Sequence, residues 1–443
     1  MNNEIKDETK KKKRHLFHDS PLEIKWILYD VGNSAFTLMA TAIIPIYFNA
    51  IATAGGITDT AATSIWGYTA SIVTLFVAVL GPILGTCSDY RGFKRPFFFL
   101  AAILGIIGCM ALAIPMPYIA FLVIYIFAKI FYSVSLIFYD SMLSDVTSLE
   151  KADDISSKGY AFGYIGSCLP FLISVALIIL TDLPTSITIP VAFLINGLWW
   201  LAFTLPLFLS YRQKHYVERK PHAIKENFKR LFSVFGKKHD MANKKGILLY
   251  LFAFFFYIDG VYTIIDMATS FGTALGFDST SLLLALLVTQ IIAFPAAFAY
   301  GKLAKKVRND ILILVGIVAY TGIAVFAIFM NQVWQFWLLA CVVGLFQGGV
   351  QALSRSYFAK IIPEAESGCL FGILDIFGKG ASLLGTFLSS LVITLTDDIH
   401  LGVIPIACLF VLGIAFFLLS MKENRKFLDI REGKNVSMTT EGE

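Results

Sequence analysis

Long apolar segments, separated by short polar ones, occupy nearly the whole chain. Most are about 20–25 residues long, enough to cross a hydrocarbon core of about 30 Å as a tilted helix. They lie at approximately 26–50, 62–87, 96–115, 118–142, 159–180, 188–209, 247–271, 280–303, 311–330, 333–357, 367–394 and 401–421. The pattern predicts an all-α polytopic membrane protein with twelve transmembrane helices.

Composition supports this interpretation. Charged residues make up 15% of the 443 residues and hydrophobic residues 57%, whereas soluble domains contain about 25% charged residues. The mean hydropathy is +0.73. The six cysteines lie in or beside apolar segments and form no CxxC pair, so we expect neither a disulfide framework nor a metal site. All six histidines lie outside the segments, which argues against a histidine proton relay. We expect no cofactor.

The basic residues predict the orientation. The chain has 36 lysines and arginines, and every second connection between apolar segments, beginning with residues 51–61, contains none of them. Positive charge is retained on the cytoplasmic side of a membrane, so we expect both termini in the cytoplasm. Lys129 and Lys379 are exceptions that lie inside apolar segments. The net charge of +5 therefore follows from orientation, and we expect the lipid bilayer, not nucleic acid, as its partner.

The same pattern divides the chain into two halves of six helices. We expect a basic cytoplasmic tail at 1–25, an N-terminal half at 26–210, a basic cytoplasmic linker at 211–245, a C-terminal half at 246–421 and a cytoplasmic tail at 422–443. The linker fits a connector that lies on anionic lipid better than a partner-binding site. Gly85 and Gly301 end the second segment of each half, 216 residues apart. Such a parallel repeat is typical of transporters whose halves rock about a midplane site.

One connection carries a spaced motif. The stretch "GTCSDYRGFKR" has the form G-x3-D-x2-G-x-K-R, with Gly85, Asp89, Gly92, Lys94 and Arg95 at the named positions. It resembles the loop between helices 2 and 3 of the major facilitator superfamily. The resemblance implies the major facilitator fold and a gating role, in which the loop latches the two halves together.

The second half departs from this motif. "GKLAKKVRND" keeps Gly301, but Lys305 stands at the acidic position and Arg308 at a glycine position. We therefore assign this loop no function.

A narrower resemblance covers most of the chain. "WILYDVGNSAF", "FYDSMLSD", "GYAFGYIGS", "YIDGVYTII" and "GGVQALSRSYFAKIIPE" occur in this order. Together they resemble bacterial relatives of the fungal vacuolar amino-acid effluxers, a branch of the same superfamily. The resemblance implies a monomeric secondary transporter of the bacterial plasma (inner) membrane, not an enzyme. Its partners would be a small-molecule solute and a proton or another coupling ion.

Several polar residues lie near the middle of their segments. They are Lys129, Asp259, Gln290, Gln347 and Lys379, with Tyr262 one turn from Asp259. An ionisable residue inside a membrane is by default a candidate for function. The family's helix arrangement implies that these side chains converge on one midplane cavity, where they would bind substrate or couple transport. Asp259 and Lys129 can also form an ion pair between the halves, whereas Lys379 can simply neutralise Asp375 within one helix.

Four further residues lie toward the cytoplasmic ends. Asp30, with Asn33 beside it, can either line the cytoplasmic mouth or bind a partner on a neighbouring helix. Asp140 and Arg355 occupy repeat-equivalent positions, 215 residues apart. Opposite charges there suggest a gate between the halves, although exposed charges at the membrane boundary are the plainer interpretation.

The sequence therefore favours a carrier that works by alternating access and uses an ion gradient. Two midplane lysines fit a carboxylate on the solute, and Asp259 fits an amino group or a coupling proton. An amino acid or related zwitterion satisfies both charges. The alternatives are an organic anion or a sugar-like solute, and, outside transport, a membrane receptor or a lipid scramblase.

Overall fold

The computed structural model describes residues 19–181, 183–218, 243–396 and 398–431. Most of the predicted N-terminal tail, the middle of the linker and the end of the C-terminal tail lie outside these ranges. The described chain is helical apart from its connections, which contain one isolated β-bridge between Tyr90 and Val217.

Twelve long helices follow one another in two groups of six. The first group is α2 (Pro21–Ala54), α3 (Asp59–Ser88), α4 (Lys94–Ala111), α5 (Tyr118–Ser141), α7 (Ala152–Leu180) and α8 (Thr185–Ser210). The second is α10 (Lys244–Ala274), α11 (Ser279–Leu303), α12 (Asn309–Ala327), α13 (Val333–Ile361), α14 (Ser367–Thr396) and α15 (Ile404–Arg431). The short helices α6 (Leu143–Val146), η1 (Glu364–Glu366) and η2 (Leu401–Val403) lie in connections.

The predicted all-α membrane architecture is confirmed. Among the described residues, ten helices are long and apolar enough to cross a membrane. The other two long helices, α3 and α14, contain the shorter apolar stretches Ile72–Ser88 and Leu384–Thr396. Large apolar side chains such as Leu180, Phe329 and Leu395 are exposed on the protein surface, as expected of side chains that face lipid.

Several helices extend beyond the predicted segments. The apolar pattern begins at residue 159, but α7 starts at Ala152 and gains a polar first turn with Asp153 and Asp154. Hydropathy misses this turn, although acidic side chains there interact favourably with the helix dipole. At the start of α2, Ser20 and Glu23 form a capping box, which satisfies backbone donors that the helix leaves free. Polar helix starts are thus stabilised by local hydrogen bonds.

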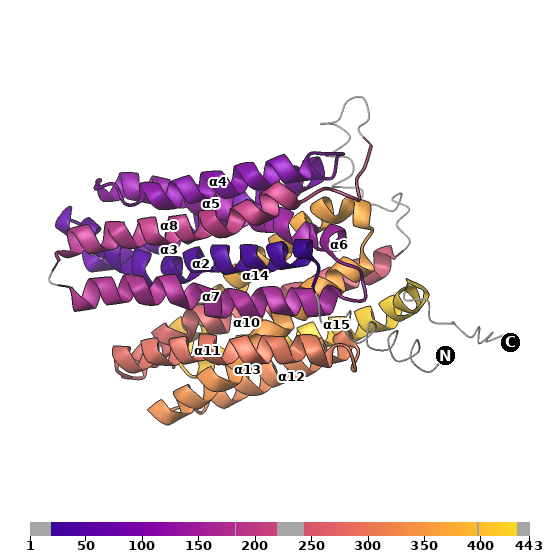
Figure 1. Ribbon diagram of the computed structural model, residues 1–443. Helices are drawn as coiled ribbons and strands as arrows, with labels where there is room; N and C mark the ends of the chain where they lie inside the picture. Colours follow the sequence, from indigo (N-terminus) through magenta and orange to yellow (C-terminus); the bar gives the residue numbers. More distant parts are fainter. Residues whose placement is uncertain (1–18, 182, 219–242, 397, 432–443) are drawn as a thin grey trace, which may run out of the picture.

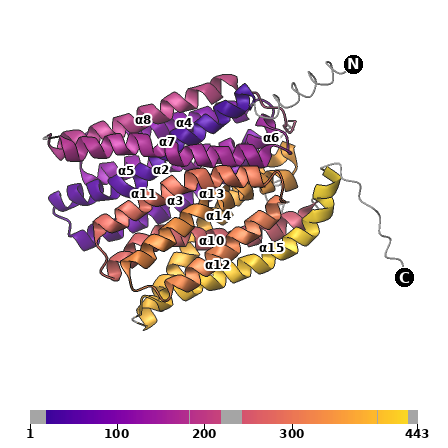
Figure 2. The ribbon, with the colours of Figure 1, turned by 60° about the horizontal axis from the view of Figure 1, so that its bottom comes forward.

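The two helix groups lie side by side, with α2 to α8 in indigo to magenta and α10 to α15 in orange to yellow (Figures 1 and 2). Between the groups, α3 packs against α14 and α7 packs against α11. We call the end of the bundle where α2 begins and α15 ends the linker end. The positive-inside pattern predicts that this end faces the cytoplasm.

At the linker end the groups approach through glycines. A Cβ atom added to Gly85 would collide with the carbonyl oxygen of Gly368, and one added to Gly372 would lie 2.9 Å from the carbonyl oxygen of Gly81. Across the α7–α11 contact, a Cβ atom on Gly301 would lie 2.8 Å from Cβ of Ser157. Small residues allow helix backbones in a membrane to come this close, so the linker end is closed in this conformation.

The Gly85 contact gives a first prediction. Gly85→Ala should weaken closure of the linker end, because the new methyl group forces α3 away from α14. Overpacking of this kind costs about 1–3 kcal/mol. The readout is the rate at which a water-soluble maleimide modifies Cys369, which is 1% exposed here, with the modified peptide identified by mass spectrometry. Gly322→Ala is the matched control, since nothing lies within 4 Å of a Cβ atom there. Equal Cys369 labelling in both variants would contradict the prediction.

Candidate functional site

A buried arginine joins the two helix groups near the linker end. Arg355 projects from α13, and its side chain is 5% exposed. Nη1 lies 3.0 Å from Asp140 Oδ1 on α5, and Nη2 lies 3.3 Å from Asp30 Oδ2 on α2. Nε and Nη2 also donate to the hydroxyl and the carbonyl oxygen of Ser156 on α7, at 2.9 and 3.0 Å. One guanidinium therefore contacts three helices of the other group.

Aromatic rings surround the same guanidinium. The rings of Trp26, Tyr160 and Tyr139 have centroids 4.6, 4.5 and 5.4 Å from Cζ of Arg355. A cation within about 6 Å of an aromatic face is attracted by the ring quadrupole. We call Arg355 with Asp30, Asp140, Ser156 and these three rings the Arg355 cluster.

The cluster resolves the geometry that the sequence left open. Asp30 binds partners in both halves, because it accepts from the Tyr139 hydroxyl on α5 at 2.8 Å and from Arg355 of the other half at 3.3 Å. Arg355 is buried and pairs with Asp140, so the interpretation as exposed boundary charges is wrong for Arg355. Asn33 lies at the edge of the cluster, where its amide donates to the Tyr29 carbonyl oxygen at 2.9 Å and to Asp30 at 3.4 Å.

A second set of polar contacts joins α7 to the other group. Asp153 is buried and accepts from Lys360 at 2.5 Å, Ser356 at 2.6 Å and Asn309 at 3.0 Å. Our sequence analysis missed Asp153 because it lies in a polar stretch outside the apolar segments. The acidic pair Asp153–Asp154 just before an apolar segment was the available signal.

The predicted latch residues lie at the α3–α14 contact. The Asp89 carboxylate is fully buried and accepts backbone N–H groups of Gly368 at 2.7 Å and Cys369 at 3.0 Å. These amides open α14, where the helix dipole favours negative charge. Lys94, also fully buried, donates to Ser367 at 2.8 Å and lies 3.9 Å from Asp89.

The remaining motif residues shape the loop itself. Gly92 has φ +79°, a left-handed conformation that favours glycine, and its N–H donates to Gln213 at 2.9 Å. Arg95 donates to the Phe208 carbonyl oxygen at 2.7 Å and stacks over the Phe208 ring. In the second half, Lys305 pairs with Asp154 across the groups at 3.0 Å.

The midplane residues do not all converge on one cavity in this conformation. The Asp259 carboxylate is fully buried, and Oδ1 accepts from Thr263 at 3.2 Å and from the Gly385 N–H at 3.1 Å. Both partners belong to the same helix group, so Asp259 does not form the predicted pair with Lys129. Oδ2 of Asp259 has no hydrogen-bond partner among the described residues.

Lys129 lies beside aromatic rings of the first group. Its Nζ is 4.9 Å from the ring centroid of Tyr132 and 5.7 Å from that of Phe36. We gave Asp266, which lies on α10 of the other group, no role from the sequence. Tyr262, also on α10, is partly buried and packs against the main apolar core. The side chain of Lys379 lies outside the described residues.

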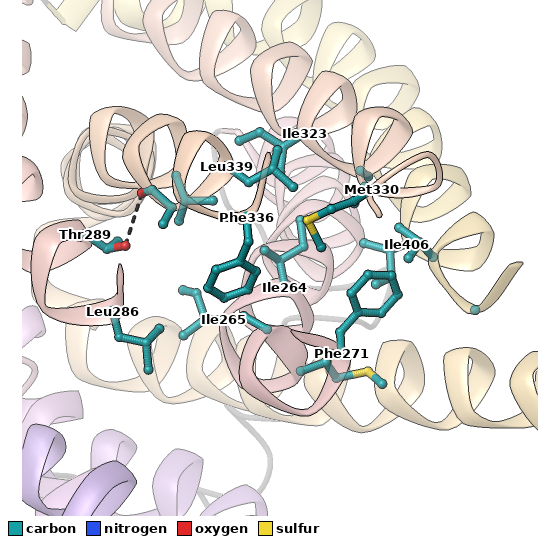
Figure 3. A pocket seen from close by; sticks show the side chains of 18 of the residues that line it. Ile264, Ile265, Phe271, Leu286, Thr289, Ile323, Met330, Phe336, Leu339 and Ile406 are labelled. Carbon is teal, nitrogen blue, oxygen red and sulfur yellow. Dashed lines mark hydrogen bonds between the residues drawn. The ribbon is translucent and has the colours of Figure 1, made fainter. Parts of the chain in front are cut away.

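Gln290 and Gln347 line a cavity of about 120 Å³ inside the second helix group. Its walls are otherwise mostly apolar, with Ile264, Ile265, Phe271, Leu286, Ile323, Met330, Phe336, Leu339 and Ile406 around it (Figure 3). Thr289 adds a hydroxyl, which donates to the Ala340 carbonyl oxygen at 3.1 Å. The two glutamines therefore share a cavity, but Asp259 and Lys129 do not line it.

Residues 22–428 match the family described as "Vacuole effluxer Atg22 like". The chain belongs to this family. The "Uncharacterized MFS-type transporter YxiO" of Bacillus subtilis (strain 168) is 40% identical over 400 residues, which cover 88% of this chain and 93% of that protein. "Autophagy-related protein 22" of the fungus Vanderwaltozyma polyspora is 27% identical over 323 residues, or 65% of this chain and 60% of that protein. The chain thus spans less than two thirds of this fungal relative.

Solved structures share the fold of this Atg22-like chain. The human organic anion transporter MFSD10 (TETRAN) has a TM-score of 0.69 at 15% identity, covering 89% of this chain and 98% of that one. The transporter FucP, in its outward conformation, has a TM-score of 0.68 at 14% identity, covering 90% and 98%. At such identities the likeness shows the fold alone. The Atg22-like chain is therefore a multi-pass membrane transporter of the major facilitator superfamily, for a small-molecule solute.

A histidine at the start of the linker adds a charged contact between the helix groups. Nδ1 of His215 lies 2.9 Å from Asp145 Oδ1 on α6, and Nε2 lies 2.7 Å from Glu364 Oε2 on η1. Both ring nitrogens can donate only when the imidazole is protonated. The hydrogen bond to Asp145 raises the pKa of His215, and the charge of Glu364 raises it further. Partial burial and the charge of Lys94 lower this pKa, but by less. Burial alone would raise the pKa of Asp145, but His215, Lys94 and Tyr211 lower it.

This contact predicts a pH dependence. Because the pKa of His215 is raised when the contact is formed, its stabilisation is complete below the ordinary histidine value of about 6.5 and is lost as pH rises through the raised pKa. Asp145, whose pKa is lowered, stays ionised throughout this range. A double-mutant cycle of His215→Gln and Glu364→Gln, read by thermal unfolding of purified protein, should show coupling at pH 6 that disappears at alkaline pH. Coupling of equal size at both pH values would contradict this.

The latch gives a separate prediction. Asp89→Asn should slow transport but leave solute binding, because Asp89 contacts the α14 backbone and not a solute cavity. The amide retains one acceptor but loses the charge that interacts with the helix N-terminus. Affinity by calorimetry and turnover in proteoliposomes should be measured on the same preparation. Loss of binding in a folded variant would place Asp89 in the solute site.

Proposed function

We propose that this Atg22-like transporter moves an amino acid or a related small zwitterion by alternating access, coupled to protons. The observation that carries the proposal is the Arg355 cluster. Its guanidinium and its carboxylates come from opposite helix groups, so the groups must break a buried ion pair whenever they separate at the linker end. Breaking such a pair is costly, about 3–5 kcal/mol when one charge is left uncompensated, which makes it a conformational switch.

Charges of both signs support a zwitterionic solute. Lys129 on α5 and Asp266 on α10 carry opposite charges on opposite helix groups, and the Tyr132 ring lies 4.9 Å from Lys129 Nζ. An ammonium can compensate a solute carboxylate in a low-dielectric site, and a carboxylate can do the same for an amine. The resemblance to fungal vacuolar effluxers points to amino acids, although the chain matches only part of those proteins.

The buried carboxylate of Asp259 supports proton coupling. One of its oxygens accepts two hydrogen bonds and the other has no partner among the described residues. Burying a carboxylate charge without full hydrogen bonding is costly, and a proton on this oxygen would neutralise that charge. We therefore propose Asp259 as the coupling site and Lys129 as a solute contact.

The alternative solute is an organic anion or a sugar-like molecule, with Asp259 used for coupling only. Two fold neighbours carry such names, the human organic anion transporter and a proton:xylose symporter. A thermal-shift screen that spans amino acids, organic anions and sugars, followed by counterflow of labelled hits in proteoliposomes, distinguishes these. Counterflow demonstrates turnover, which a receptor lacks.

The coupling proposal predicts the behaviour of one variant. Asp259→Asn, which is nearly isosteric but uncharged, should abolish accumulation driven by an imposed pH gradient. Counterflow without net proton movement should survive if the carboxylate serves coupling alone. Asp278→Asn is the control, because it makes the same change at an exposed helix cap of α11. Accumulation at the wild-type level by Asp259→Asn would remove the coupling role.

A further inference from the structure

The groups that hold Arg355 all belong to one half of the protein. Asp30 and Trp26 lie on α2, Asp140 and Tyr139 on α5, and Ser156 and Tyr160 on α7. Arg355 alone comes from the second helix group. When the groups separate at the linker end, as the proposed alternating access requires, Arg355 leaves with α13. The residues that hold it stay on the first group, and we call them the receptor: Trp26, Asp30, Tyr139, Asp140, Ser156 and Tyr160.

Part of the receptor is held in place without Arg355. Tyr139 donates its hydroxyl to Asp30 Oδ2 at 2.8 Å, and Trp26 donates its indole N–H to the Tyr139 carbonyl oxygen at 3.1 Å. The rings of Trp26 and Tyr139 stack with centroids 4.4 Å apart. Gly159 keeps the space open, since a Cβ atom there would lie 2.5 Å from Asp30 Oδ2 and 3.0 Å from Arg355 Nη2. The two hydrogen bonds and the ring stacking lie within the first group, so Asp30, Tyr139 and Trp26 are preorganised.

Charge makes the vacated receptor a cation site. Two carboxylates face one guanidinium, so removal of Arg355 leaves two negative charges beside three aromatic faces. Carboxylates combined with aromatic faces bind organic cations, through charge-assisted hydrogen bonds and cation–π attraction. Two carboxylates would repel an anion, and an uncharged sugar would gain no charge–charge attraction from such a site.

We propose that this receptor binds the ammonium or guanidinium group of the transported solute when the linker end is open. Arg355 is then a tethered competitor that occupies the receptor in the closed conformation. A solute cation in the receptor blocks the return of Arg355, so this end can close only after the solute has moved on. The inference rests on the proposed function for the separation of the groups, and it narrows the solute to a cationic or zwitterionic class.

The first test removes the competitor. Arg355→Ala is purified and its thermal unfolding is followed with increasing methylguanidinium, a small mimic of the missing side chain. We expect a saturable rise in unfolding temperature that neither methylurea, which is neutral, nor sodium chloride produces. Neutralising the receptor with Asp30→Asn or Asp140→Asn in the Arg355→Ala background should weaken methylguanidinium binding by about tenfold or more, the loss of one charge-assisted hydrogen bond. Arg308→Ala, which removes an arginine paired within its own group, is the control and should show no such rise.

Absence of a rise in Arg355→Ala, or a rise that persists after both carboxylates are neutralised, would overturn the receptor. If Arg355→Ala does not fold, Arg355→Gln replaces it, because glutamine retains hydrogen bonding to Ser156 but no charge. In the wild type, methylguanidinium should accelerate maleimide labelling of Cys369 by holding the linker end open, and Asp30→Asn should abolish the acceleration. Unchanged labelling of the wild type would also count against the receptor.

These measurements report binding and conformation, not turnover. A protein that binds methylguanidinium in the Arg355→Ala form but shows no counterflow of any solute would refute the proposed function while leaving the cation site intact. Counterflow of an amino acid without any response to methylguanidinium would support the proposed function and refute the cation site.

Discussion

The burial of one guanidinium between two carboxylates of the other helix group constrains the whole linker end. Arg355 satisfies its donors where Asp30, Asp140 and Ser156 meet, and it reaches this position only while the groups touch. A buried ion pair often adds little to the stability of a fold, since desolvation offsets the attraction between the charges. The pair instead creates a free-energy difference between the closed and separated conformations, because separated charges must each find a new partner.

The other contacts at this end depend on the same closed arrangement. Asp89 reaches the first amides of α14 only while Gly85 lies against Gly368, and Asp153 reaches Lys360 only while α7 lies beside α13. Each contact pairs a buried charge, which would lose its partner if the two groups moved apart. Tyr164 of α7 also donates to Gln351 of α13, at 3.2 Å, across the groups. The closed linker end is therefore a layer of mutually dependent polar contacts.

The helices could be predicted from the sequence because lipid imposes a simple rule on every segment of the chain. A run of about 20 apolar residues must hydrogen-bond its own backbone, whatever its neighbours are. Which side of a helix faces lipid and which side faces protein follows no such local rule. Successive residues rotate by about 100°, so Asp259 and Tyr262 on one helix can face different surroundings. Depth was thus a fair prediction for Asp259, but its burial against Gly385 required the tertiary structure.

Pairings between the halves were harder still. Asp30 and Arg355 are 325 residues apart, and nothing near either residue in the chain identifies the other. Asp89 was the exception, because its motif implied a latch between the halves, and the structure shows its carboxylate at the N-terminus of α14 in the other half. Asp153 escaped notice since the turn that carries it is polar and ends before the apolar pattern starts.

The two repeat-related loops show what the repeat preserves. In the first, the acidic Asp89 contacts the N-terminus of α14 across the groups. In the second, the basic Lys305 at the matching position contacts Asp154, which lies in the first turn of α7 and so already interacts with that helix N-terminus. The charge is reversed, yet each loop still meets the start of the corresponding helix in the other half. A helix N-terminus that carries its own acid accepts a lysine as readily as a bare one accepts an aspartate. Complementarity across the contact, rather than the residue type in the motif, is the physical requirement.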